Sequence, residues 1–267
     1  MWFWKRKFRR TIARLEINGV ISAPVRKWVL EGLEFIKERQ FPALLLRIDS
    51  PGGTVGDSQE IHRGICRLRT ENNVKVVASF GNISASGGVY VGVAADYIMA
   101  NAGTITGSIG VILRGNNLEK LLDRLGISFK TIKSGQFKDI LGFDRPMTPA
   151  ESAILQSLID NSYEQFVQVV AEGRKLSPAT VKSFADGRIF TGEQALGLGL
   201  VDRLGTEADA RRWTAELVGL DPEKTKVYNL KPPQTLASRL LPRGAMLTEH
   251  LAFLMETNGL PLWLCEL

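Results

Sequence analysis

Hydrophobic residues recur along the chain with two alternating periods. Residues 12–17 alternate apolar and polar side chains, which is typical of a strand with one buried face. Residues 25–39 carry apolar side chains at helical spacing, and the apolar run 43–48 enters a Pro-Gly-Gly loop, as a buried strand does. The same pattern predicts further helices at 57–70, 86–95 and 117–125, and further strands at 74–80, 97–100, 109–113 and 129–132.

This alternation predicts an α/β domain whose sheet is largely parallel. A loop is expected at 133–149. A long helix should follow it, with Thr148 as N-cap and Pro149 in the first turn, and another helix at 206–220. After residue 231 the chain becomes Leu-rich and is interrupted by proline and glycine. We therefore expect three parts, which are a segment at 1–10, one domain at 11–230, and an extension at 231–267 that packs on a partner or neighbouring subunit.

Composition narrows the class of protein. The chain has 267 residues, 44% of them hydrophobic, which is enough for a domain with a sizeable core and excludes a collagen or a disulfide scaffold. Basic residues number 34 against 28 acidic ones, and six of the basic residues precede residue 15. Beyond that point the charges balance, so nucleic-acid binding is not expected.

The first ten residues combine Trp2, Phe3 and Trp4 with a basic run. Such a mixture suits the surface of an anionic membrane, so we expect peripheral membrane contact through residues 1–10, with a solvated basic tail as the alternative. No apolar run approaches the roughly 18 residues of a spanning helix, and no cleavable signal peptide is visible. The sequence leaves open which side of a membrane the protein faces.

Metal and histidine chemistry find little support in the sequence. Cys66 and Cys265 lie far apart, and no cluster of His, Cys or acidic residues has metal-ligand spacing, so no metal and no cofactor are expected. His62 and His250 are the two histidines, and a Ser/His/Asp mechanism would rest on His62 alone.

Ser86 is the strongest chemical candidate. It precedes Gly87-Gly88, between a predicted strand and an apolar helix, where free backbone N–H groups could stabilise an oxyanion formed by serine attack on a carbonyl. A simple helix cap is the alternative. A second Gly-Gly pair at 52–53 follows another buried strand, at the edge where parallel sheets bind ligands.

Lys138 lies in the expected loop at 133–149. A lysine acts as a general base only when it is neutral, and burial in an apolar site can lower its pKa by about 3–5 units. Most lysines are solvated, so physical reasoning alone does not single out Lys138.

Five motifs in order resemble those of the signal peptide peptidase A (SppA) family of serine peptidases, in its short form. The resemblance covers roughly residues 12–220. The motifs are DSPGG at 49–53, SASGGVY at 84–90, TGSIGV at 106–111, KSGQFKD at 133–139, and FTG through GLVD at 190–202. The family implies a ClpP/crotonase-like fold, built from repeated strand-strand-helix units with a largely parallel sheet, and a Ser/Lys dyad.

Carried onto this chain, the resemblance implies that Ser86 is the nucleophile and Lys138 the general base. Ser108 would orient the lysine, and Gly53 and Gly87 would supply the oxyanion-hole amides. Two features depart from the family. Many bacterial members have an N-terminal transmembrane anchor, whereas this sequence shows an aromatic and basic segment at 1–10. The Leu-rich tail lies outside the matched motifs.

The resemblance implies a serine endopeptidase that cleaves extended apolar peptides, such as remnant signal peptides, through an acyl-enzyme. The family's long form builds its site between two tandem domains, so a single-domain chain is expected to form a ring in which Lys138 reaches Ser86 of an adjacent copy. The apolar C-terminal tail would seal that ring. The alternatives are a crotonase-like acyl-CoA enzyme and a non-catalytic, membrane-attached peptide-binding scaffold.

Overall fold

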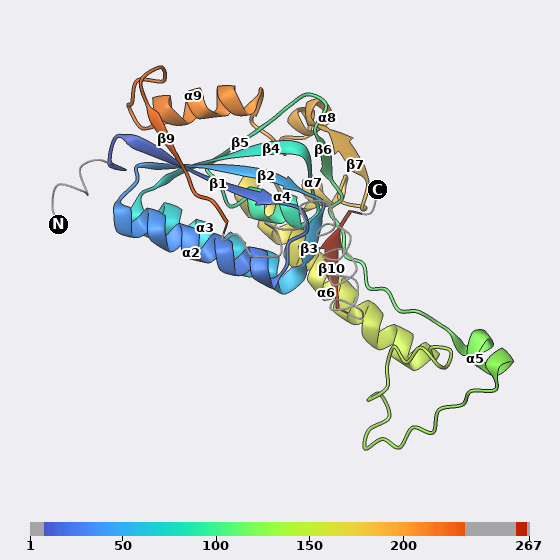
Figure 1. Cartoon of the computed structure of the whole chain (residues 1–267). Coiled ribbons are helices and arrows are strands. Elements are labelled where there is room, and N and C mark those ends of the chain that lie inside the picture. The colour runs from blue at the N-terminus through green and yellow to red at the C-terminus, as the bar shows by residue number, and fades with distance from the viewer. Residues whose placement is uncertain (1–7, 233–259, 266–267) are drawn as a thin grey trace.

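The computed structural model describes residues 8–232 and 260–265. Its main sheet is mixed but mostly parallel, with the order β7-β6-β4-β2-β1-β9 and with β5 and β8 attached beside β4 (Figure 1). Only the β6–β7 pair of this sheet is antiparallel among the described strands. The strands are β1 (Thr11–Asn18), β2 (Ala43–Ser50), β4 (Lys75–Ala85), β5 (Tyr97–Ala100), β6 (Ile105–Gly107), β7 (Ile189–Thr191), β8 (Arg203–Leu204) and β9 (Lys226–Asn229).

Helices cover both faces of the sheet (Figure 1). Because side chains alternate along a strand, Leu44 and Leu46 of β2 join the core toward α2 (Ala23–Arg39) and α3 (Val55–Asn72). Leu45 between them faces the smaller cluster under α9 (Glu207–Leu217). The remaining helices are α4 (Gly87–Gly92), α5 (Glu119–Leu125), α6 (Pro149–Arg174), α7 (Pro178–Lys182) and α8 (Gly192–Gly197).

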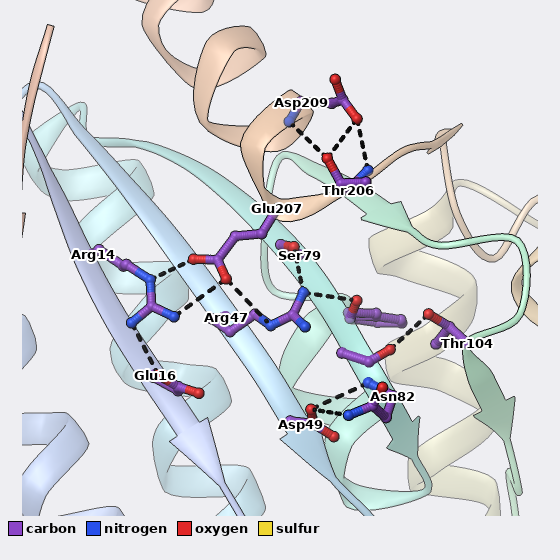
Figure 2. Close-up of polar contacts among 12 residues, drawn as sticks. Arg14, Glu16, Arg47, Asp49, Ser79, Asn82, Thr104, Thr206, Glu207 and Asp209 are labelled. Atoms are coloured by element: carbon purple, nitrogen blue, oxygen red, sulfur yellow. Dashed lines mark hydrogen bonds and ion pairs between the residues drawn. The ribbon is translucent and has the colours of Figure 1, made fainter.

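Charged contacts attach α9 to the sheet. Glu207 binds Arg14 of β1 and lies 3.6 Å from Arg47 of β2, and the Arg14 guanidinium lowers the pKa of this carboxyl (Figure 2). Arg47 in turn donates to Ser79 Oγ at 3.0 Å and to the Phe80 carbonyl at 3.1 Å, both on β4. One acidic side chain thus links three neighbouring strands to the helix above them.

A long arm connects β6 to α6. It runs from residue 113 through α5 and an irregular segment to the start of α6, and it extends away from the sheet (Figure 1). The predicted helix at 117–125 forms as α5, but none of its residues is buried, and Leu121 and Leu125 are exposed. The predictions of strands at 109–113 and 129–132 were wrong. Within the described residues neither segment pairs with a strand of the sheet, and Ile112 forms an isolated bridge with Leu262.

The long helix begins where the sequence predicts. Thr148 caps α6 and accepts a hydrogen bond from the Glu151 amide, while the Glu151 side chain accepts one from the Thr148 amide. This capping box satisfies two amides that the first helical turn leaves free.

The chain's two end segments are described only in part. Residues 1–7, on which the membrane prediction mainly rests, lie outside the described residues, and Phe8 is buried against Phe35, Phe41 and Tyr228. At the other end, β10 (Leu262–Leu264) pairs antiparallel with β3 (Gly52–Thr54). The expectation that the tail packs on a partner was therefore wrong for these residues, which pack on their own chain.

Candidate active site

Ser86 occupies a strained turn between β4 and α4. Its backbone has φ 52° and ψ −115°, a conformation that is uncommon for residues other than glycine. The turn is held by the Ser86 amide, which donates to the Gly107 carbonyl at 2.8 Å, and by the Ser86 carbonyl, which accepts from the Tyr90 amide at 3.0 Å. The hydroxyl is buried and has no hydrogen-bond partner among the described residues. A serine on a strained turn between a strand and a helix is typical of a nucleophilic serine.

Two glycine amides lie beside this turn. Gly87 begins α4, and a Cβ placed on it would lie 3.1 Å from the Gly53 amide nitrogen. In β3, the Gly52 carbonyl accepts from Ile21 at 2.7 Å and the Thr54 amide donates to Ile21 at 3.0 Å. Because successive amides of a strand point to opposite sides, the Gly53 amide points away from Ile21. The structure therefore brings Gly53 and Gly87 together next to Ser86.

Asp49 supports the segment that leads to Ser86. Its carboxylate accepts from the Asn82 amide and side chain, both at 3.2 Å (Figure 2). It also accepts from the Ile83 amide at 3.1 Å. Gly81 has no room for a side chain, because its Cβ would lie 2.4 Å from the Asp49 carboxyl carbon. Asp49 has a positioning role that sequence reasoning did not assign, although an acidic residue at the end of a buried strand was a visible signal.

Ser108 directly follows β6, which pairs with the strand that leads to Ser86. Ala85 and Gly107 are partners in the parallel register of β4 and β6, so the residues that follow them, Ser86 and Ser108, are neighbours. Ser108 also has a positive φ of 52°, and its amide donates to the Arg188 carbonyl at 2.7 Å. It lines a pocket of ≈ 850 Å³ that is open to solvent.

Lys138 is not part of this cluster within the chain. It is exposed in the arm, which extends away from the sheet (Figure 1). Its loop is closed by Lys133, which donates to Asp139 at 2.5 Å and to the Gln136 carbonyl at 2.9 Å. Arg145 joins Asp139 to Glu151 at the start of α6, and its hydrogen bonds are the main reason that the pKa of each carboxyl falls to about 2. Ion pairs thus give the loop a defined conformation far from the sheet.

His62 lies on α3 against the ring of Tyr90, with centroids 5.1 Å apart. Burial lowers its pKa to about 4 and keeps the imidazole neutral. Its polar neighbour is the Cys66 sulfur at 3.8 Å, and no hydrogen bond in the described chain joins it to Ser86, whose hydroxyl is unpaired. Within the described residues, no group of three His, Cys, Asp or Glu side chains could hold a metal ion.

A strained serine after a buried strand, beside paired glycine amides, is the arrangement of a serine hydrolase on an α/β fold. The chain belongs to peptidase family S49, whose model matches residues 69–221. A protein of Synechocystis sp. (strain ATCC 27184 / PCC 6803 / Kazusa) named as a protease, slr0021, is 56% identical over 99% of both chains. An Enterococcus faecium protein named as a signal peptide peptidase SppA is 36% identical over 75% of this chain, which spans 62% of that relative.

Solved structures confirm the ClpP-like fold. A variant of the 1510-N membrane-bound stomatin-specific protease, in complex with a substrate peptide, has a TM-score of 0.60 at 16% identity and covers 90% of this chain and 98% of its own. A ClpP1 variant from Listeria monocytogenes has a TM-score of 0.52 at 16% identity, with coverages of 78% and 98%. At these identities the likeness concerns the fold alone. No helix in the described part of the chain is long and apolar enough to cross a membrane.

Proposed function

We propose that this protein is a serine endopeptidase that uses a Ser86/Lys138 dyad. Ser86 attacks the peptide carbonyl, the amides of Gly53 and Gly87 bind the oxyanion, and water hydrolyses the acyl-enzyme. The observation that carries the proposal is the buried, unpartnered Ser86 hydroxyl on a strained turn beside two glycine amides. A crotonase-like acyl-CoA enzyme needs paired amides but no such serine.

The general base would come from a second copy of the chain. Lys138 is exposed in an arm that also exposes many apolar side chains, and exposed apolar surface of this extent marks an interaction site. These side chains are Leu118, Leu121, Leu125, Ile127, Phe129, Ile132, Phe137 and Phe143. The open pocket beside Ser108 could receive the arm of a neighbour, and Ser108 would then orient the incoming amine. A ring-like homo-oligomer would repeat this contact from copy to copy.

The substrates would be extended, largely apolar peptides, such as remnant signal peptides. The name of the E. faecium relative and the substrate peptide bound to the 1510-N protease support a peptide substrate. A peripheral membrane location through residues 1–10 fits such substrates, and the membrane-bound state of the 1510-N protease supports it. Neither a metal nor a cofactor enters the proposed reaction.

Covalent labelling tests the nucleophile. A fluorophosphonate should modify the full-length protein at a single serine, and peptide mapping should place the adduct on Ser86. Ser86→Ala should lose both the adduct and peptide hydrolysis while it keeps the wild-type melting temperature. Labelling at another serine, or hydrolysis that survives Ser86→Ala, would refute the proposal.

Mixing two inactive variants tests the shared site. Ser86→Ala and Lys138→Ala should each be inactive alone. After subunit exchange at equal amounts, about one quarter of wild-type activity should return, because each site needs an intact serine from one copy and an intact lysine from the next. Exchange that is demonstrated by differently tagged subunits, with no return of activity, would rule out a site shared between copies.

A further inference from the structure

The guanidinium of Arg145 joins the loop that carries Lys138 to the start of α6. Its Nε donates to the Asp139 carboxylate at 3.2 Å, and one Nη donates to the Asp139 carbonyl oxygen, also at 3.2 Å. The two Nη atoms donate to the two carboxylate oxygens of Glu151, at 2.5 and 2.9 Å, and a further bond reaches the Pro146 carbonyl at 3.1 Å. The five N–H donors of this arginine are therefore all engaged, in a planar fork that lysine could not reproduce.

The end of this link at Glu151 is held in place. The Glu151 side chain is 3% exposed and also accepts hydrogen bonds from the amide and the hydroxyl of Thr148. Phe166 and Val170, near the other end of the same helix, are buried in the core. At 1.5 Å per residue, the stretch from Glu151 to Phe166 is roughly 22 Å long. The helix α6 thus holds the link at a fixed point well outside the core.

The rest of the arm gives the Lys138 loop less support. The arm extends away from the sheet, and its helix α5 has no buried residue (Figure 1). The Leu118 amide donates to the Phe143 carbonyl at 2.7 Å, and the ring of Phe129 packs edge-on against that of Phe143 at 5.4 Å. Both contacts join one part of the arm to another, so they do not fix the loop relative to the core. The bonds of Arg145 to Glu151 do, because they reach α6.

We infer that Arg145 is a positioning residue for the general base, because it fixes the loop next to Lys138 to the start of α6. The inference rests on the proposed Ser86/Lys138 dyad and adds to it a residue that acts through Asp139, without contact with the substrate. A base supplied by a neighbouring copy must present its amine at a fixed point, and a misplacement of about 1 Å can lower a rate by about 10². Both carboxyls of the link stay ionised near neutral pH, since the hydrogen bonds of Arg145 lower the pKa of each to about 2.

The kinetics of Arg145→Ala test this role. With a fluorogenic apolar peptide, kcat should fall by about 10² while KM stays within about twofold, because the peptide would bind beside Ser86 of the other copy. Arg145→Lys keeps the charge but not the fork, so it should lose most of the same activity. Arg124→Ala is the matched control and should keep wild-type kcat, since Arg124 is exposed on α5 of the same arm and makes no ion pair within the described residues.

A second site tests whether Arg145 acts through Asp139. Asp139→Ala leaves Arg145 bound to Glu151, so the start of α6 stays intact while the loop is released. It should lower kcat as Arg145→Ala does. The double variant Arg145→Ala/Asp139→Ala should be no slower than the slower single variant, because both substitutions break the same link. If the two losses multiplied in the double variant, Arg145 would not act through Asp139 and the inference would be wrong.

Subunit mixing separates positioning of the lysine from a general effect on folding. Arg145→Ala mixed with Ser86→Ala should regain activity as Lys138→Ala does, because the Ser86→Ala copies supply an intact arm. Mixed with Lys138→Ala, it should stay at the level of the two variants alone, because no copy then supplies a positioned base. A variant that merely folded poorly would lower activity in both mixtures. Differently tagged subunits verify the exchange in each mixture.

The outcomes distinguish this inference from the proposed function. If wild type labels at Ser86 and Lys138→Ala is inactive, but Arg145→Ala keeps kcat within about threefold of wild type, the positioning role is wrong. The role is also wrong if Arg145→Ala regains activity with Lys138→Ala, or fails to regain it with Ser86→Ala where the Lys138→Ala mixture succeeds. If wild type neither labels nor hydrolyses peptides, or if Lys138→Ala stays active, the proposed dyad itself fails.

Discussion

Gly87→Ala offers a direct test of the proposed oxyanion hole, because the added methyl group would enter it. The new Cβ would lie 3.1 Å from the Gly53 amide nitrogen and 3.1 Å from the carbonyl oxygen of Trp263. A peptide carbonyl held between the two amides must therefore move outward, which lengthens both hydrogen bonds. Loss of one oxyanion donor typically lowers kcat by about 10²–10³, or about 2.7–4 kcal/mol, and we expect a loss of that size.

The same substitution should lower stability moderately and leave the protein folded. Alanine is better than glycine in a helix interior by up to about 1 kcal/mol, and Gly87, as the first residue of α4, gains less than this. Against this gain stands the contact with Ser58 Oγ at 2.8 Å, which rotation of the hydroxyl relieves with loss of its hydrogen bond to the Thr54 carbonyl, a loss of about 1 kcal/mol. The 3.1 Å contacts with the backbone of Gly53 and Trp263 add to this cost, so kcat is compared on the folded variant, in which activity should fall far more than stability.

The assay is kcat at saturating peptide, together with thermal unfolding. Gly56→Ala is the control, since Gly56 lies in α3 and a Cβ there has no atom within 4 Å. It should keep wild-type kcat and be equally or more stable. If Gly87→Ala kept kcat within about threefold of wild type while folded, the oxyanion hole would have to be elsewhere.

Two further predictions concern stability and positioning. The pKa of His62 is lowered to about 4 in the folded protein from its ordinary 6.5, so unfolded chains bind the proton first and stability should fall by up to ~3 kcal/mol as pH drops from 6.5 to 4. Urea unfolding at pH 7 and pH 5 should show this slope, and His62→Gln should flatten it without lowering kcat; an unchanged slope would contradict the assignment. Asp49→Ala leaves the Asn82 and Ile83 amides without their acceptor, so it should cost about 2 kcal/mol in urea unfolding and lower kcat, whereas Asn82→Ala, which removes one side-chain donor, should cost less. If Asp49→Ala and Asn82→Ala changed the free energy of unfolding and kcat equally, the positioning role of Asp49 would be refuted.

Much of the fold follows from local sequence features. The alternation in β1 and the apolar run of β2 predicted strands because a sheet between two helical layers buries such residues, and Thr148 with Pro149 predicted the start of α6 because capping depends on neighbouring residues. The family motifs predicted which residues gather around Ser86. Gly53, Gly87 and Ser108 do so because each follows a strand of the same sheet.

The arm and the tail show where local pattern is insufficient. The segment at 129–132, with Phe129 and Ile132 at its ends, was predicted as a strand, yet it has no partner strand in the described chain and is exposed. Hydrophobicity indicates that a segment needs to be covered, but it does not say whether its own chain or another will cover it. For the tail, the prediction was that another chain would cover it, and this was wrong for Leu262–Leu264. These residues pair with β3 of their own chain.

By itself, the sequence determined the class of fold, the order of the main elements and the family, because these depend on periodicity, capping and short motifs. Only the tertiary structure decided that Lys138 stands apart from Ser86 within one chain, that Asp49 supports the turn before Ser86, and that Trp263 lies over the glycine amides. Each of these is a relation between residues distant in sequence. Such relations are set by how the elements pack together, which no local pattern encodes.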